Sequence, residues 1–288
     1  MIGPAIKPRR SVLYLPAANA RAVAKARTLA CDAVILDLED AVAPDLKAEA
    51  REQAVAAISE GGFGRRELVI RINGRDTPWY EEDLAAAREA RPDAVLLPKV
   101  NGPADVTACA AGLDRDTPVW AMVETARSMF QLEAIAATAH TDRLACFVLG
   151  TNDLLKEFRA HAMLGRENVM PFLMAAIAAA RGHGLAVIDG VYNAFEDNEG
   201  FLAECRQGVA MGFDGKTLIH PRQVEACNAA FSPTAHEVEW ARRIVAAFDE
   251  PENARRGAIR IDGKMVELLH LDQARYALAR ADAAVSDA

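Results

Sequence analysis

AVILDLEDAVAPDLKAEAR, residues 33–51, sets an unbroken apolar run against a dense group of acids. Its first four residues are apolar, and Asp37, Glu39 and Asp40 follow them directly. A continuous apolar run is typical of a strand that is buried on both faces, as in a parallel sheet. Residues 47–58 then have helical spacing, and the segment from Asp45 to Lys47 is expected to cap that helix at its N-terminus. The stretch predicts one strand–helix unit with acids at the carboxyl end of its strand.

Apolar runs of this kind recur along the chain, and most are followed by Ala-rich segments with helical spacing. The eight predicted strands cover residues 12–16, 33–40, 68–73, 94–100, 119–125, 144–150, 186–192 and 215–220. Alternating strands and helices favour parallel pairing, because parallel strands need a crossover connection. Eight such units predict an α/β fold, a closed (β/α)8 TIM barrel, which typically has roughly 250 residues. A doubly wound open sheet is the competing architecture, but YLPAANARA after the first strand lacks its G-x-G-x-x-G turn.

The last part of the chain has a different pattern. Residues 232–288 predict a helix, a Gly- and Arg-containing loop, a short hairpin around AIRIDGKMVE and a second helix. We therefore divide the chain into a barrel domain, residues 1–231, and a C-terminal helical segment, residues 232–288. The second segment is expected to act as a lid or to contribute to oligomerisation.

Composition excludes several classes of partner. The chain has 288 residues, 51% of them hydrophobic, and a formal net charge of -8. An acidic protein with no basic block is a poor candidate for binding nucleic acid or an anionic membrane surface. MIGPAIKPRR has no apolar signal region, and no apolar run approaches the roughly 20 residues of a membrane span. With five scattered cysteines, the expectation is a cytoplasmic protein with reduced thiols.

Polar residues gather where the predicted strands end. In (β/α)8 barrels the chemistry takes place at the carboxyl ends of the strands. In this chain the apolar part of each run precedes the polar part. The polar residues at these ends are Asp37, Glu39, Asp40, Arg71, Asn73, Lys99, Glu124, Thr125, Asp153, Asp189, Lys216 and His220.

Glu124 and Asp153 are the candidate metal ligands. They follow neighbouring strands, so their carboxylates can converge on one point, and oxygen ligands without a Cys or His cluster suit Mg²⁺. The alternative is that each acid caps the helix after its strand. For either acid alone the capping role is favoured, but for the two together, facing Arg71, the metal site is favoured.

Arg71 lies inside a predicted strand, where a charged side chain is costly unless it is paired. Its planar fork suits a substrate carboxylate, and a structural ion pair with the acids of residues 37–40 is an equal alternative; both can hold. Asp37, Glu39 and Asp40 would orient Arg71 and the waters of the metal site. Lys99 could bind phosphate or only line the rim, and Asp189 is more simply structural.

The chain resembles the citrate lyase β-subunit-like family of the HpcH/HpaI aldolase superfamily, which includes malyl-CoA and citramalyl-CoA lyases. The resemblance rests on an ordered set of motifs that spans nearly the whole chain. They are RRSVLYLP (9–16), DAVILDLEDAVAPDLKAEAR (32–51), RIN (71–73), LPKV (97–100), VETA (123–126), GTNDL (150–154), GFDGKTLIHPRQV (212–224) and NAAFSPT (228–234).

This resemblance implies a barrel with a C-terminal lid, in trimers or hexamers where the lid closes a neighbour's site. It implies Mg²⁺ at Glu124 and Asp153, with Arg71 holding the keto-acid carboxylate. It places coenzyme A (CoA) near the end of the first strand, around Tyr14, Leu15, Pro16 and Lys25. The substrate-lining positions that it implies are Val123, Asn152, Ile219 and His220.

Two departures from the family pattern stand out. The usual Pro-Gly after the first strand is Pro16-Ala17 here, with Asn19 at the position of a basic residue of malyl-CoA lyases. Relatives carry a catalytic aspartate in the lid, and this chain reads GKMVELLHL, which places Glu267 there. A longer acid can shift the reacting proton by about 1 Å, which can cost roughly 100-fold in rate. Either Glu267 acts as the acid/base in an adjusted pocket, or this chain catalyses different chemistry.

The resulting functional expectation is a Mg²⁺-dependent carbon–carbon lyase. It would cleave a 3-hydroxyacyl-CoA thioester of the malyl-CoA or citramalyl-CoA type into acetyl-CoA and a 2-keto acid, with Arg71 and Glu267 as the catalytic residues. The alternatives are a citrate lyase β subunit that acts on a carrier-bound substrate, a malate synthase or thioesterase, and a ligand-binding barrel without catalysis.

Overall fold

The computed structural model describes residues 7–253 and 255–285. The chain divides into two compact units, of which the larger is Arg9–Ala229. Among the described residues, the smaller comprises residues 7–8, 230–253 and 255–285. Each unit is described by itself.

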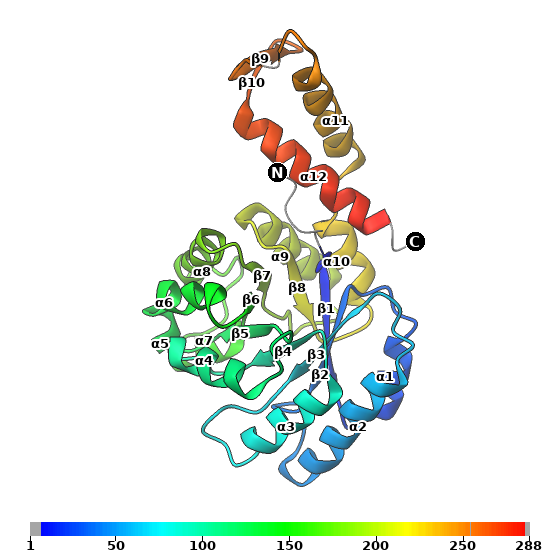
Figure 1. The fold of residues 1–288 in the computed structure, drawn as a ribbon, viewed down its shortest axis with the longest axis vertical. Helices are drawn as coiled ribbons and strands as arrows, with labels where there is room; N and C mark the ends of the chain where they lie inside the picture. The colour runs from blue at the N-terminus through cyan, green and yellow to red at the C-terminus, as the bar shows by residue number, and fades with distance from the viewer. Residues whose placement is uncertain (1–6, 254, 286–288) are drawn as a thin grey trace. The chain divides into compact units, whose positions relative to one another are not determined.

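Eight parallel strands close into a barrel in the larger unit, with helices around it (Figure 1). Each strand pairs with its neighbours in chain order, and β1 also pairs with β8. The predicted (β/α)8 fold is confirmed. The strands are β1 (Ser11–Pro16), β2 (Ala33–Asp37), β3 (Glu67–Arg71), β4 (Ala94–Leu97), β5 (Val119–Val123), β6 (Leu144–Leu149), β7 (Ala186–Asp189) and β8 (Gly215–Leu218).

Helices and short 3-10 turns connect these strands. They are α1 (Ala20–Ala26), the 3-10 turn η1 (Pro44–Leu46), α2 (Lys47–Glu60), α3 (Tyr80–Ala90), α4 (Pro103–Gly112), α5 (Ala126–Met129), α6 (Leu132–Ala137), η2 (Thr138–His140), α7 (Thr151–Glu157), α8 (Met170–Gly182), α9 (Asn198–Met211) and α10 (Gln223–Phe231).

The two-residue period of the strands separates an apolar barrel interior from a charged layer above it. Alternate residues of a strand share one face. Each of three strands therefore carries a charged residue two positions after a core residue. These pairs are Ile35 and Asp37, Val69 and Arg71, and Met122 and Glu124. The interior is filled by these three apolar residues with Val12, Leu96, Trp120, Cys146, Val148 and Ile188.

The start of α2 differs from the prediction. Pro44 opens the turn η1, so Asp45 lies inside that turn instead of capping α2. The N-cap position of α2 is Leu46, which makes no side-chain capping bond. Lys47 is buried, and its side chain turns back to the loop after β2. The expected cap from Asp45 to Lys47 is therefore wrong.

All five cysteines are buried in the described part of the chain. They are free thiols at Cys31, Cys109, Cys146, Cys205 and Cys227. Burial raises the pKa of Cys31 to about 11 and that of Cys109 to about 12. Their distribution agrees with the expectation of reduced thiols in the core.

The smaller unit contains a helix, a hairpin and a second helix. Its elements are α11 (Ala235–Asp249), β9 (Ala258–Ile261), β10 (Lys264–Glu267) and α12 (Leu268–Val285). Asp262 and Gly263 both have positive φ, as a two-residue turn between antiparallel strands requires. Thr234 and Glu237 form a capping box at the start of α11. The apolar core of this unit comprises Ala241, Ile244, Phe248, Ile259, Val266, Leu271 and Ala274.

Among the helices of the described residues, none has both the length and the apolar character that crossing a membrane requires.

Candidate active site

Glu124 follows β5 at the upper rim of the barrel, and its side chain is fully buried. Its Oε1 accepts a hydrogen bond of 2.8 Å from the backbone N–H of Lys99. Its Oε2 is buried and has no hydrogen-bond partner among the described residues. Burial raises the pKa of Glu124, and the charge of Lys99 opposes that rise. A buried carboxylate oxygen without a donor is costly, which indicates a missing ligand at this position.

Gly150 makes room for this carboxylate. A Cβ at Gly150 would lie 2.3 Å from Oε2 of Glu124 and 2.5 Å from its Cβ, closer than real Cβ atoms approach. The glycine of the GTNDL motif is therefore a steric requirement of the Glu124 side chain.

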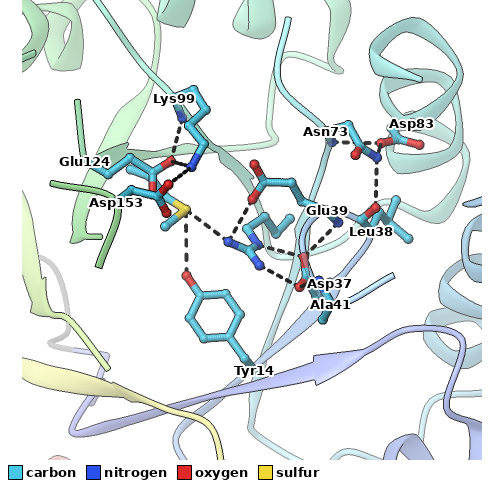
Figure 2. A network of polar contacts seen from close by, with 12 residues as sticks. Tyr14, Asp37, Leu38, Glu39, Ala41, Asn73, Asp83, Lys99, Glu124 and Asp153 are labelled. Carbon is cyan, nitrogen blue, oxygen red and sulfur yellow. Dashed lines mark hydrogen bonds and ion pairs between the residues drawn. The ribbon is translucent and has the colours of Figure 1, made fainter. Parts of the chain in front are cut away.

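Asp153 brings a second carboxylate to the same place. It lies in the first turn of α7, where a negative charge is favourable. The ammonium of Lys99 lies 2.8 Å from Oδ1 of Asp153 and 3.5 Å from Oε1 of Glu124 (Figure 2). The two acids thus converge on one cation, as the sequence predicts.

Neither acid makes a side-chain cap, although Asp153 does have the first-turn position that the capping alternative describes. Thr125 caps α5 by accepting a hydrogen bond from the Ser128 N–H, so Glu124 has no such role. The N-cap position of α7 is Gly150, which makes no side-chain cap.

The residues present suit Mg²⁺. This ion is commonly bound through one or two carboxylates, while water and substrate oxygens complete its octahedral coordination. Glu124 and Asp153 supply two carboxylates that already face a cation, and Oε2 of Glu124 is free of other bonds. Across the described residues there is no group of three or more His, Cys, Asp or Glu side chains able to hold a metal. The remaining coordination positions would therefore be available to water and substrate.

Arg71 forms the ion pairs that were one of its two predicted roles. Its Nε and Nη2 donate to the two oxygens of Asp37 at 2.7 and 2.6 Å. Its Nη1 lies 2.8 Å from Oε2 of Glu39, and its guanidinium lies 4.8 Å from the ring centre of Tyr14. Asp37 therefore fixes the orientation of Arg71 through a two-pronged pair.

Glu39 is a carboxyl group with an altered proton affinity. Burial raises the pKa of Glu39 to about 8, against the lowering effect of Arg71, and the charges of Glu124 and Asp40 raise it further. At neutral pH Glu39 therefore carries a proton most of the time, which leaves Asp37 as the permanent counterion of Arg71. Asp40 is exposed and acts on this group only through its charge.

Lys47 is the residue that sequence reasoning missed. Its buried ammonium donates to the carbonyl oxygens of Leu38 and Glu39 at 2.6 and 2.8 Å and to Oδ1 of Asn73 at 2.8 Å. Asn73 in turn donates to Asp83 and to the Leu38 carbonyl. This network fixes the loop that carries Glu39. No local signal in the sequence identifies it, because its acceptors lie in the loop after β2 and at Asn73 after β3.

The positions implied by the family resemblance vary in their surroundings. Tyr14 directs its hydroxyl to Sδ of Met122 at 3.8 Å. Asn152 exchanges two hydrogen bonds with Asn193, and His220 stacks on Phe195 with ring centres 4.7 Å apart. The other positions have no such side-chain partners: Leu15 and Val123 are buried, while Lys25 and Ile219 are exposed.

Asp189 has the structural role that the sequence favours. It is fully buried between Arg166, at 2.7 Å, and Lys216, at 3.0 Å. These cations hold the pKa of Asp189 below its usual range, although burial opposes them. Sequence reasoning had no means to identify Arg166 as the partner.

Glu267, the predicted acid/base, ends β10 in the smaller unit. Its backbone N–H donates to Nδ1 of His270 at 3.0 Å. Its part in the barrel site stays a prediction.

A cavity of about 600 Å³ in the barrel unit is lined by residues of α7, of the loops after α7 and β7, and of α9. Asn152 and Asn193 line it, together with apolar side chains such as Leu155 and Val191. An apolar cavity with a few polar groups is typical of small-molecule sites. Glu124 and Asp153 are not among its lining residues, although Thr151 and Asn152 of the same motif are.

Comparisons with known proteins place these features in context. A family model described as HpcH/HpaI aldolase/citrate lyase matches residues 10–221. A (3S)-malyl-CoA thioesterase of Cereibacter sphaeroides is 50% identical over 276 residues, which cover 96% of this chain and 95% of that protein. An L-malyl-CoA/beta-methylmalyl-CoA lyase of the same species is 32% identical, and the match covers 97% of this chain and 96% of the lyase.

A solved structure gives the same relationship in three dimensions. The protein CitE of Mycobacterium tuberculosis, in complex with magnesium, acetoacetate and coenzyme A, matches with a TM-score of 0.79 and 31% identity. The match covers 96% of this chain and 99% of the CitE chain.

Proposed function

Because the chain belongs to the HpcH/HpaI aldolase/citrate lyase family, we propose that it is a Mg²⁺-dependent enzyme that hydrolyses the thioester of a malyl-CoA-type substrate. The observation that carries the metal site is the convergence of Glu124 and Asp153 on one cation, with Oε2 of Glu124 lacking a partner. Hydrolysis is favoured over carbon–carbon cleavage because the relative named a thioesterase is 50% identical, whereas the relative named a lyase is 32% identical.

Each charged residue of the site has a separate task in this proposal. Bound Mg²⁺ would act as a Lewis acid toward the hydroxy-acid end of the substrate. Arg71 would bind the free carboxylate of the substrate with Nη1, the nitrogen that now faces Glu39, while Asp37 keeps the guanidinium plane fixed. Protonated Glu39 adds no charge that would repel this anion.

Carbon–carbon cleavage is the second candidate. The family description and the relative that is named a malyl-CoA/beta-methylmalyl-CoA lyase both favour it. In this reaction Glu267 would protonate the carbon of the departing acetyl-CoA enolate. A citrate lyase β subunit of Leuconostoc mesenteroides is also similar, at 31% identity, which keeps a carrier-bound substrate as a variant of this reaction.

One incubation separates the two reactions. The purified protein is mixed with MgCl₂ and (3S)-malyl-CoA, and free CoA thiol, acetyl-CoA and glyoxylate are measured in the same sample. Hydrolysis releases one thiol for each substrate and no glyoxylate. Lyase activity releases glyoxylate and acetyl-CoA in equal amounts and no free thiol.

Two controls complete this test. The Glu124→Gln/Asp153→Asn double variant should be inactive, and chelation of the metal should stop the reaction in the unaltered protein. Turnover that persists in both controls would contradict the proposed metal site. The absence of every product would contradict the proposed substrate.

A further inference from the structure

Lys99 occupies the point at which the two candidate metal ligands meet. Its ammonium is 2.8 Å from Asp153 Oδ1 and 3.5 Å from Glu124 Oε1, while its backbone N–H holds the same Oε1 at 2.8 Å. Figure 2 shows the ammonium between the two carboxylates. Lys99 also has φ +53°, a left-handed conformation that is uncommon for a residue other than glycine. Its backbone is thus held in an unusual conformation at the point where its side chain neutralises both acids.

An ammonium and a divalent ion cannot share this position. Mg²⁺ binds carboxylate oxygens at about 2.0–2.1 Å, so it needs the lone pair of Asp153 that now faces Lys99. The two cations would also repel each other at this separation. The backbone N–H of Lys99 can keep its bond to Oε1, because Oε2 of Glu124 remains free for the ion.

We propose that Lys99 is a placeholder cation, which neutralises Glu124 and Asp153 in the metal-free protein and is displaced when Mg²⁺ binds. This inference rests on the metal site of the proposed function. It goes beyond that function because it assigns to Lys99 a competition with the metal. The Lys99 side chain is 32% exposed although its Nζ is buried, so rotation of the side chain can carry the ammonium to solvent without a change in the barrel strands.

The proposal has two linked consequences. The ion pairs of Lys99 stabilise the metal-free form, and whatever stabilises that form lowers the affinity for the metal by the same free energy. Removal of the ammonium should therefore tighten Mg²⁺ binding and, at the same time, destabilise the protein in the absence of metal.

The test compares three proteins by calorimetric titration with MgCl₂ alone. Lys99→Met should bind Mg²⁺ roughly fivefold more tightly than the unaltered protein, which is the size expected for a partly exposed ion pair. Lys156→Met is the matched control, because Lys156 is an exposed lysine of α7 three residues from Asp153. Its affinity should stay within about twofold of the unaltered protein if general charge repulsion is a small effect.

Thermal unfolding gives a second readout that does not depend on activity. In the presence of a chelator, Lys99→Met should unfold at a lower temperature than the unaltered protein. Saturating MgCl₂ should raise its unfolding temperature by more than it raises that of the unaltered protein. Lys99→Gln, which keeps a polar side chain of intermediate length, should behave in the same way and serves if the methionine variant does not fold.

The outcomes separate the two proposals. Unchanged or weaker Mg²⁺ binding in both Lys99 variants would overturn the placeholder role alone, provided that Glu124→Gln/Asp153→Asn abolishes binding. An equal gain in Lys156→Met would also overturn it, because the effect would then be general repulsion. Binding that survives in the double variant would overturn the metal site itself.

Discussion

Gly150 is the residue on which the geometry of Glu124 depends most directly. The backbone of the turn between β6 and α7 passes so close to this carboxylate that a methyl group cannot be placed between them. The glycine is needed here for space, since its φ does not lie in the left-handed region. Its neighbour in the motif, Asp153, is needed for charge.

Gly150→Ala is therefore expected to damage the metal site more than the fold. Overpacking of this kind typically costs about 1–3 kcal/mol, and the displaced Glu124 should lower Mg²⁺ affinity at least tenfold in a calorimetric titration. Gly182→Ala is the matched control, because nothing lies within 4 Å of a Cβ at Gly182. Full Mg²⁺ affinity in Gly150→Ala would show that Glu124 does not need this position.

Glu39 gives the stability of the protein a pH dependence. Its folded-state pKa of about 8 lies above its ordinary value of 4.5, because burial disfavours the charge. The folded state therefore holds this proton more tightly than the unfolded state. The stabilisation is complete below about pH 4.5 and is lost as the pH rises through about 8.

Glu39→Gln, which resembles the protonated acid, should remove this loss of stability at high pH. The melting temperature of Glu39→Gln minus that of the unaltered protein should be larger at pH 8.5 than at pH 5.5. Each kcal/mol of stability corresponds to about 2–4 °C in melting temperature. Glu52→Gln is the control, since Glu52 is an exposed acid of α2 that does not contribute to the pKa shift of Glu39. The same difference in melting temperature at both pH values would mean that Glu39 ionises at its ordinary pKa.

Residues differ in how far the sequence alone can place them. Glu124 and Asp153 were predictable because the strand period puts the end of each apolar run at the rim. The choice between the two roles of Arg71, and the position of Lys99, depended on distances between strands. No pattern within one segment contains those distances.

At the scale of elements, the junction of β2 and α2 shows what local signals cannot decide. The acid before α2 predicts a cap, yet Pro44 starts a 3-10 turn and the buried Lys47 secures the junction instead. Its three acceptors come from the loop after β2 and from Asn73 after β3. The burial of this lysine therefore depends on residues that follow two different strands, which its own segment does not reveal. The strands themselves were predictable because each apolar run lies within one segment.

Lys47→Met should be strongly destabilising. The change leaves two buried carbonyl oxygens and the amide oxygen of Asn73 without their shared donor, which should cost about 3 kcal/mol or more. Thermal unfolding should show a decrease of about 6 °C or more. The exposed-lysine variant Lys156→Met should remain close to the unaltered protein. A melting temperature for Lys47→Met equal to that of this control would contradict the structural role.

At the scale of the whole molecule, the predicted acid/base Glu267 belongs to the C-terminal unit, whereas the candidate metal ligands belong to the barrel. Its position at the end of β10 is known within its own unit. The family resemblance predicts that this unit closes the site of a neighbouring subunit. The barrel itself was predictable because its strands repeat one pattern eight times, but assembly depends on surfaces that such a pattern does not describe.

Complementation between two inactive variants tests this assembly. If the reaction is carbon–carbon cleavage, Glu267→Gln should reduce turnover by about 100-fold or more, as expected for a lost acid/base, without weakening Mg²⁺ binding. Co-expression with Glu124→Gln/Asp153→Asn should restore up to about a quarter of the activity, because random mixing places an intact lid on an intact barrel in that share of sites. Each variant expressed alone is the control. Failure of the mixture to recover activity would mean that each lid serves its own barrel or none.

The burial of every cysteine has a practical consequence for kinetic work. A cysteine reacts with a disulfide reagent only when its thiol is ionised and the reagent can reach it. Burial disfavours the ionised thiol and blocks the reagent. A disulfide reagent that gives a coloured product with thiols should therefore react at once with the CoA that the enzyme releases. The protein's own thiols should add little background colour. Over hours, the slow reaction of the protein thiols would measure how often the barrel opens by local unfolding. One reagent can therefore follow both turnover and local unfolding.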